Sequence, residues 1–158
     1  MALMHPESHL PQQRRAQRVA AALSMCIACS PAVACWDDVA SWYGVNVHLL
    51  YAIAKTESSF NPNAMNRNKN GTYDVGLMQI NSTWLPTLRK YGVTEAHLKD
   101  PCTNLQVGAW ILSHNMARMG TTWEAVGAYN ARNPQLRIKY AQKVYKNIPR
   151  EHLMPDSD

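Results

Sequence analysis

Two carboxylate side chains in this 158-residue sequence have the types and the spacing that acid–base chemistry requires. Glu57 ends an apolar segment, and Asp74 follows 17 residues later. A carboxyl group kept protonated by an apolar environment can donate a proton to a leaving oxygen, whereas an ionised one stabilises positive charge on the reacting carbon. Cleavage of a glycosidic bond needs both groups, so the pair predicts a glycan-cleaving enzyme.

Glu57 is predicted to lie on the apolar face of a helix. Asn46 is a suitable N-cap for a helix from Val47 to about Ser58. In this helix Glu57 belongs to the three- and four-residue repeat that also contains Leu50, Ile53 and Ala54. Apolar neighbours and the following Phe60 would raise the pKa of Glu57, because desolvation penalises the charged form. We therefore expect Glu57 to be the proton donor.

The remaining signals predict a mainly α protein, with a helical bundle around a cleft and a small β-hairpin. Asn70-Gly71 indicates a tight turn, in a hairpin or an irregular loop, that presents Asp74. Helix start and stop signals predict four further helices. The first is capped by Ser82 and reaches about Tyr91, and the second runs from Pro101 to Met119. The third begins with a Thr121/Glu124 capping box and reaches about Tyr129, and the fourth runs from Pro134 to about Asn147.

The N-terminal 34 residues resemble a signal peptide. Arginines precede an apolar stretch from Val19 to about Cys29, and Ala32-Val33-Ala34 is a small-residue cleavage site. The apolar stretch is shorter than the roughly 20 residues that a membrane span requires. We expect one domain over residues 35–158, exported to the periplasm and without a stable membrane span after cleavage. A retained anchor and lipid attachment at Cys35 are the alternatives.

Composition disfavours several other classes of protein. The formal net charge of +5 is a mild excess that suits a polyanionic or zwitterionic surface such as a cell wall. It falls short of the dense basic stripe typical of nucleic-acid binding. The six His form no His-Glu-x-x-His motif or close ligand pair, and no phosphate-binding glycine loop occurs. We expect a monomer without metal or cofactor.

Three ordered motifs resemble those of bacterial lytic transglycosylases of the soluble transglycosylase type. They are Glu57-Ser58 after Ile-Ala-Lys-Thr, Gly76-Leu-Met-Gln79, and Ala128-Tyr129-Asn130. The segment from Asn66 to Ser82 and the spacing of the two carboxylates resemble the c-type lysozymes, which share the fold core. Typical transglycosylases lack this Asp. This combination of transglycosylase motifs and lysozyme features resembles the small specialised enzymes that accompany type III secretion, type IV secretion, conjugation and pilus systems.

The resemblance implies a lysozyme-like α+β fold and cleavage of the MurNAc–GlcNAc β-1,4 bond of peptidoglycan with formation of 1,6-anhydroMurNAc. Glu57 would act first as acid and then as base, and Asp74 would be a nucleophile, a charge stabiliser or a residue that positions water. The substrate-binding residues implied by the resemblance are Ser58, Met78, Gln79, Asn81, Tyr129, Asn130 and Tyr140. In that set Met78 and Tyr129 would line the cleft.

Cysteine usage points to one disulfide. Cys26 and Cys29 would leave with the signal peptide, so Cys35 and Cys102 remain as the candidate pair in an exported chain. The secretion-associated subgroup has a disulfide at the corresponding positions. A redox or metal role for Cys26-x-x-Cys29 would require that segment to survive and fold.

Two other functions remain open at this point. The first is a hydrolytic muramidase that acts on the same bond, and the second is a non-catalytic scaffold that binds peptidoglycan. The partners expected are glycan strands and a component of a secretion or conjugation apparatus. One residue departs from the family pattern, because Arg132 stands where Gly usually follows Ala-Tyr-Asn-Ala. Either the loop backbone differs here or the arginine faces substrate carboxylates.

Overall fold

The computed structural model describes residues 31–149 as a mainly helical protein with a small antiparallel sheet, as predicted. The sheet has the order β1-β2-β3, one strand more than the expected hairpin. The helices are α1 Pro31–Tyr43, α2 Val47–Ser58, α3 Leu85–Arg89, α4 Pro101–Met119, α5 Trp123–Gly127 and α6 Pro134–Asn147, with 3-10 turns at Ser82–Trp84 and His97–Lys99. The strands are β1 Met65–Arg67, β2 Tyr73–Val75 and β3 Ile80–Asn81.

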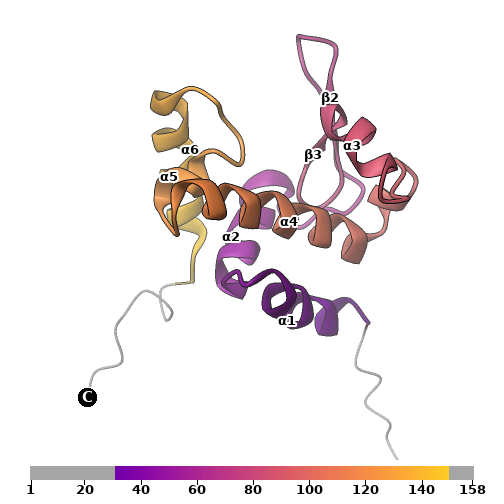
Figure 1. Ribbon diagram of the computed structural model, residues 1–158, viewed down its shortest axis with the longest axis horizontal. Coiled ribbons are helices and arrows are strands. Elements are labelled where there is room, and N and C mark those ends of the chain that lie inside the picture. The colour runs from indigo at the N-terminus through magenta and orange to yellow at the C-terminus, as the bar shows by residue number, and fades with distance from the viewer. Residues whose placement is uncertain (1–30, 150–158) are drawn as a thin grey trace, which may run out of the picture.

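Helix α4 is the central element of this arrangement. Figure 1 shows α4 with α1 along one side, the sheet beyond the other side, and α5 and α6 near its C-terminal end. The periodic apolar positions of the helices meet in one core. Its fully buried side chains include Leu50 and Ile53 of α2, Leu105 and Leu112 of α4, and Val144 of α6.

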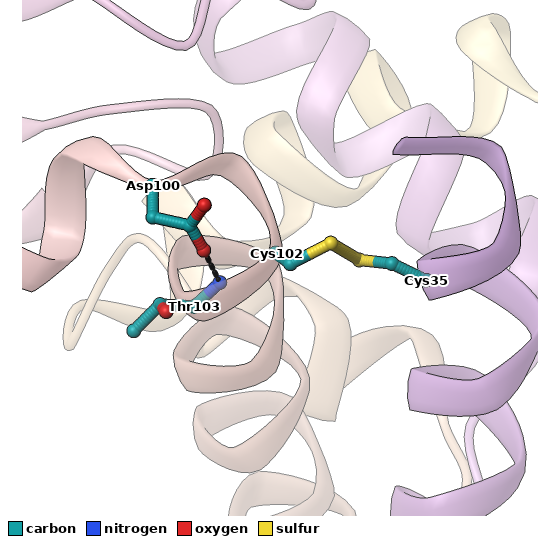
Figure 2. Close-up of a disulfide and its surroundings, with 4 residues drawn as sticks. All are labelled: Cys35, Asp100, Cys102 and Thr103. Atoms are coloured by element: carbon teal, nitrogen blue, oxygen red, sulfur yellow. Dashed lines mark hydrogen bonds between the residues drawn. A yellow bond between two sulfur atoms is a disulfide. The ribbon is translucent and has the colours of Figure 1, made fainter. Parts of the chain in front are cut away.

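A disulfide joins α1 to the first turn of α4, which confirms the predicted pair. Cys35 and Cys102 are bonded with their Cα atoms 6.0 Å apart, as Figure 2 shows. Beside them, the carboxylate of Asp100 accepts a hydrogen bond from the Thr103 N–H at 2.7 Å and caps α4. This backbone donor lowers the pKa of Asp100 because it stabilises the charged form. Closing a chain segment of this length by a disulfide contributes about 4 kcal/mol through the unfolded state.

Two helix starts lie one residue away from the prediction. Asn81, not Ser82, caps the turn before α3, since its side chain accepts from the Thr83 N–H while the Ser82 hydroxyl accepts from the Tyr73 N–H. Thr122, not Thr121, caps α5. The predicted capping box is wrong for the same reason: Glu124 binds Arg137 at 3.0 Å. Tertiary partners outcompete the local ones in both cases.

Helix α5 is also shorter than predicted and ends at Gly127 rather than near Tyr129. Helix α1 was not predicted, whereas the boundaries of α2, α4 and α6 agree with the sequence. The side chain of Asn46 caps α2, Gly120 with φ +76° follows α4, and Asn133 caps α6 through two backbone N–H groups. Predictions of helix starts were therefore best where a cap residue has no competing tertiary partner.

A single buried amide connects the sheet to α4. Asn104 is fully buried, and its Nδ2 donates to the carbonyl oxygens of Val75 and Leu98 at 2.9 and 2.8 Å. Its Oδ1 accepts from the Met78 N–H at 2.7 Å. Gly76, with φ +79°, leaves the space that this amide needs, because a Cβ there would lie 2.3 Å from Nδ2. The turn between β2 and β3 is thus fixed on α4.

The expected signal peptide stays a prediction. Residues 1–30, including Cys26 and Cys29, lie outside the described residues, and the backbone of α1 begins at Pro31, ahead of the predicted cleavage site. Among residues 31–149, no helix has the length and apolar character needed to cross a membrane.

We predict that Asn104→Leu destabilises the protein by about 3 kcal/mol or more, because three buried backbone groups lose their partners at about 1–3 kcal/mol each. Urea unfolding measures this change. Asn115→Leu on the same helix is the matched control, since the buried Nδ2 of Asn115 has no hydrogen-bond partner among the described residues. Equal losses in the two variants would contradict the role assigned to Asn104.

Candidate active site

Glu57 lies in the last turn of α2, where the helix ends abruptly. Ser59 and Phe60 both adopt positive φ, 52° and 65°, which is uncommon for residues with a side chain. The Ser58 hydroxyl donates to the Leu77 carbonyl oxygen at 2.7 Å and so ties the helix end to the turn between β2 and β3. The backbone of Glu57 therefore has a fixed position relative to the sheet.

The Glu57 carboxyl group binds a tyrosine and is shielded from water. The Tyr140 hydroxyl donates to Glu57 Oε1 at 2.5 Å. Burial raises the pKa of Glu57 from 4.5 to about 7, the Tyr140 hydrogen bond and Lys143 lower it, and the negative charge of Asp74 raises it. Desolvation is the largest of these effects, as the sequence predicted. At neutral pH a substantial fraction of Glu57 is protonated.

Phe60, one of the two aromatic residues expected near Glu57, does not pack beside its carboxyl group. Phe60 is 42% exposed and packs edge-on against Trp36 and Tyr51. The ring beside the carboxyl group is that of Tyr140, which reaches it from α6 and is 5% exposed. The left-handed backbone at residues 59 and 60 takes the Phe60 side chain to another cluster, and this turn could not be predicted from the apolar pattern.

Two tyrosine hydroxyls act as donors near Glu57. Tyr129 donates to the Met78 carbonyl oxygen at 2.9 Å, and its ring stacks on that of Tyr140 at a centroid distance of 6.4 Å. Burial, and next the charge of Glu57, raise the pKa of both hydroxyls above the usual value of tyrosine. They therefore stay protonated at physiological pH and remain donors.

Asp74 lies in the middle strand, and both of its carboxylate oxygens accept side-chain amides. Oδ1 accepts from Asn81 Nδ2 at 2.7 Å, and Oδ2 accepts from Asn68 Nδ2 at 2.9 Å. Asn81 is directly opposite Asp74 in β3, so the strand register itself places one donor. The arrangement can hold a negative charge in a fixed orientation.

The side chain of Gln79 binds the turn between β2 and β3 and also the segment at β1. Its Nε2 donates to the carbonyl oxygens of Gly76 and Ala64 at 2.8 and 3.2 Å, and its Oε1 accepts from Asn66 Nδ2 at 2.8 Å. The residue has φ 48° and is 8% exposed. These contacts stabilise the turn that leads into β3.

A cleft of about 720 Å³ brings most of the predicted residues together. One wall comes from the sheet and the other from the segment after α5, and Ile111 of α4 lies between them. Figure 1 shows the sheet toward the N-terminal half of α4, and α5 near the C-terminal end. The residues of the predicted site that line the cleft are Glu57, Asp74, Gln79, Asn81, Tyr129 and Asn130.

Three residues of the predicted site lie behind the cleft. The expectation that Met78 lines the cleft does not match its placement, because its side chain is fully buried against Gly108, where a Cβ would lie 2.8 Å from the methionine Cε. Ser58 and Tyr140 do not line the cleft either, and they contact the Leu77 carbonyl and Glu57 instead. These residues support the lining residues.

Several cleft residues were missed by the sequence analysis. They are Asn68, Asn70, Thr72, Thr83, Trp84 and Ile111. Arg132 also lines the cleft, which agrees with one of the two alternatives given for it. The two-residue period of a strand places Thr72 on the same face as Asp74, so the sequence could have predicted Thr72 as a cleft residue. Trp84 and Ile111 gave no local signal because tertiary packing brings them to the cleft. Within residues 31–149, no group of three or more His, Cys, Asp or Glu side chains could hold a metal ion.

The fold belongs to the lysozyme-like class of lytic transglycosylases. A solved structure of an inactive mutant of lytic transglycosylase Slt from Pseudomonas aeruginosa superimposes with a TM-score of 0.59 and 24% sequence identity. The match covers 73% of this chain and 23% of that one, so the similarity concerns the fold of one part of a much longer protein.

The family is shown by sequence comparison. Residues 34–150 match the model of the Transglycosylase SLT domain. Invasion protein IagB of Salmonella typhimurium is 46% identical over 110 residues, which cover 66% of this chain and 69% of that protein. Protein IpgF of Shigella flexneri is 42% identical over 113 residues, 68% of this chain and 74% of its own. The chain belongs to the SLT transglycosylase family and is a peptidoglycan lytic transglycosylase.

We predict that Tyr140→Phe raises the pKa of Glu57 further above its ordinary value, because the lost hydrogen bond stabilises the carboxylate. Carbon-13 NMR of labelled glutamate side chains measures this pKa, with Glu57→Gln to assign the signal. Tyr129→Phe is the control, because its hydroxyl binds the Met78 carbonyl and not Glu57. An unchanged or lowered pKa in Tyr140→Phe would refute the proposed contact.

Proposed function

We propose that this protein is an exported lytic transglycosylase that cleaves the MurNAc–GlcNAc β-1,4 bond and forms 1,6-anhydroMurNAc, with Glu57 as its acid and base. The observation that carries the proposal is the Glu57 carboxyl group itself. It lines a cleft, binds the Tyr140 hydroxyl, and has a pKa of about 7. Such a group can donate and accept a proton near neutral pH.

In the first step, Glu57 donates its proton to the bridging oxygen while the bond from C1 of MurNAc to that oxygen breaks. The sugar ring then carries oxocarbenium-like positive charge. The ionised Asp74, fixed by Asn81 and Asn68, supports this step by stabilising that charge. The GlcNAc side leaves as a free hydroxyl.

In the second step, the Glu57 carboxylate removes the proton from the C6 hydroxyl of the same MurNAc. O6 bonds to C1 and closes the 1,6-anhydro ring, so no water is consumed. The Tyr140 hydrogen bond suits this step because it stabilises the carboxylate that the first step leaves behind. Glu57 regains its proton and is ready for another cycle.

Hydrolysis of the same bond is the second candidate, and Asp74 is the observation that favours it. A carboxylate fixed opposite the acid resembles the lysozyme arrangement, in which a covalent intermediate or a positioned water leads to a reducing-end product. Asp74 lines the cleft together with Glu57, and its charge raises the pKa of Glu57. Product composition separates the two reactions.

Product analysis on purified sacculi tests both candidates. We expect anhydro-ended muropeptides from the wild type and a rate at least about 100-fold lower from Glu57→Gln, which cannot transfer the proton. Asp74→Asn should slow cleavage and keep the anhydro product. The exposed Asp37→Asn on α1 is the control and should leave the rate unchanged.

Mass spectrometry of the muropeptides gives the readout. Predominantly reducing-end products would establish the muramidase instead. Unchanged lysis by Glu57→Gln would mean that Glu57 is not the acid of the reaction. No lysis by either the wild type or the variant would mean that the protein binds peptidoglycan without cleaving it, as a scaffold would.

We further propose that the protein acts outside the cytoplasm in the service of a secretion, conjugation or pilus apparatus. The Cys35–Cys102 disulfide suits an oxidising compartment. The resemblance of the chain to the specialised subgroup supports an association with such an apparatus, and one relative carries the name invasion protein. A locally acting enzyme would open a gap in the wall rather than remodel it generally.

An apparatus-associated role predicts that deletion impairs protein export or DNA transfer while growth stays close to that of the wild type. Export assays and growth curves of the deletion strain measure this, with complementation by the wild type and by Glu57→Gln. Rescue by the wild type alone would link the role to cleavage. A general defect in growth or cell shape with normal export would contradict it.

A further inference from the structure

One cation lines the cleft. Arg132 lies on the wall formed after α5, and it is the only Lys or Arg among the described residues that line the cleft. The cleft contains two acids, Glu57 and Asp74.

Arg132 has no ionic partner among residues 31–149. Glu124, the acid nearest to Arg132 in the sequence, forms an ion pair with Arg137 instead. Both oxygens of Asp74 accept side-chain amides, and Glu57 accepts the Tyr140 hydroxyl. Within residues 31–149, the Arg132 side chain makes no hydrogen bond or ion pair.

The backbone that carries Arg132 is fixed on both sides. The Ala131 carbonyl oxygen accepts from Arg137 Nε at 3.1 Å, and the Ala131 N–H donates to the Gly127 carbonyl at 3.2 Å. On the other side, Asn133 caps α6. Arg132 does not have a positive φ, so an arginine fits this backbone without the change in loop geometry that was one of the two alternatives. Its side chain starts from a rigid position in the cleft wall.

We propose that Arg132 binds a carboxylate carried by the muramic acid substituent of the substrate, and so selects muramyl glycans over neutral ones. This inference rests on the function proposed for the cleft. A guanidinium with its donors free binds a carboxylate in a bidentate manner. The glycan offers that group in two forms, the lactyl carboxylate of a peptide-free MurNAc and the carboxylates of a stem peptide.

Binding measurements separate this role from simple solvation of a surface arginine. Glu57→Gln provides a background in which ligands are bound but not cleaved, and the tryptophan fluorescence of Trp84 in the cleft provides a signal. The ligands are peptide-free muroglycan oligomers, the same oligomers with their lactyl carboxylates methyl-esterified, and oligomers that keep their stem peptides. Each is titrated into Glu57→Gln alone and combined with Arg132→Gln, Arg132→Gly or Arg132→Lys.

We expect Arg132→Gln and Arg132→Gly to weaken binding of carboxylate-bearing oligomers by about 5- to 20-fold, the loss of one charge-assisted contact partly screened by water. Binding of the methyl esters should not change, and Arg132→Lys should restore part of the affinity. Weakening with peptide-free oligomers alone identifies the lactyl carboxylate, and weakening with peptide-bearing oligomers alone identifies the stem peptide. Lys139→Gln, an exposed charge on α6 outside the cleft, is the control and should have no effect.

Two results would overturn the inference. One is equal weakening of the acids and their methyl esters, which would mean that Arg132 shapes the wall rather than binding a carboxylate. The other is unchanged affinity for every carboxylate-bearing ligand. Neither result touches the proposed cleavage reaction, because that reaction is tested separately by the products of the wild type and by the rate of Glu57→Gln on sacculi.

Discussion

The turn between β2 and β3 is the point on which the rest of the site depends. Three side chains from distant parts of the chain bind its backbone: Ser58 reaches the Leu77 carbonyl, Asn104 reaches both Val75 and Met78, and Tyr129 reaches the Met78 carbonyl. Buried backbone groups must find partners, and here those partners come from α2, α4 and the segment after α5. The turn is thereby fixed relative to Glu57 on one side and Asp74 on the other. Two of these contacts join residues of the family motifs to each other, namely Ser58 to Leu77 and Tyr129 to Met78.

Placing an acid in this framework has an energetic consequence. The folded protein binds the proton of Glu57 more tightly than the unfolded chain does, since the pKa is about 7 rather than 4.5. This contribution to stability is therefore full below about pH 4.5 and is lost as the pH rises through 7. Tyr140 limits the loss by stabilising the carboxylate. The same burial that costs stability makes the group a proton donor at neutral pH.

Predictions from the sequence agree best with the structure where the signal lies within a few neighbouring residues. Helices α2, α4 and α6 were predicted to within a residue or two, because their caps and their apolar repeat act within a few residues. The predicted caps of the turn before α3 and of α5 were each wrong by one residue, where Ser82 and Glu124 had competing tertiary partners. In the cleft, Glu57 and Asp74 were found from residue type and spacing. Met78 was misplaced, because a cleft residue and a core residue look alike in a motif.

The amino-acid sequence by itself determined the mainly helical class, the acid at the end of an apolar helix, the cysteine pair and the family motifs. Only the tertiary structure decided that Tyr140, 83 residues away, supplies the hydrogen bond to Glu57, and that Arg132 lies in the cleft without an ionic partner among the described residues. The reason is physical: helix and cap preferences arise from neighbours along the chain, whereas desolvation and hydrogen bonding across the cleft depend on packing between distant segments.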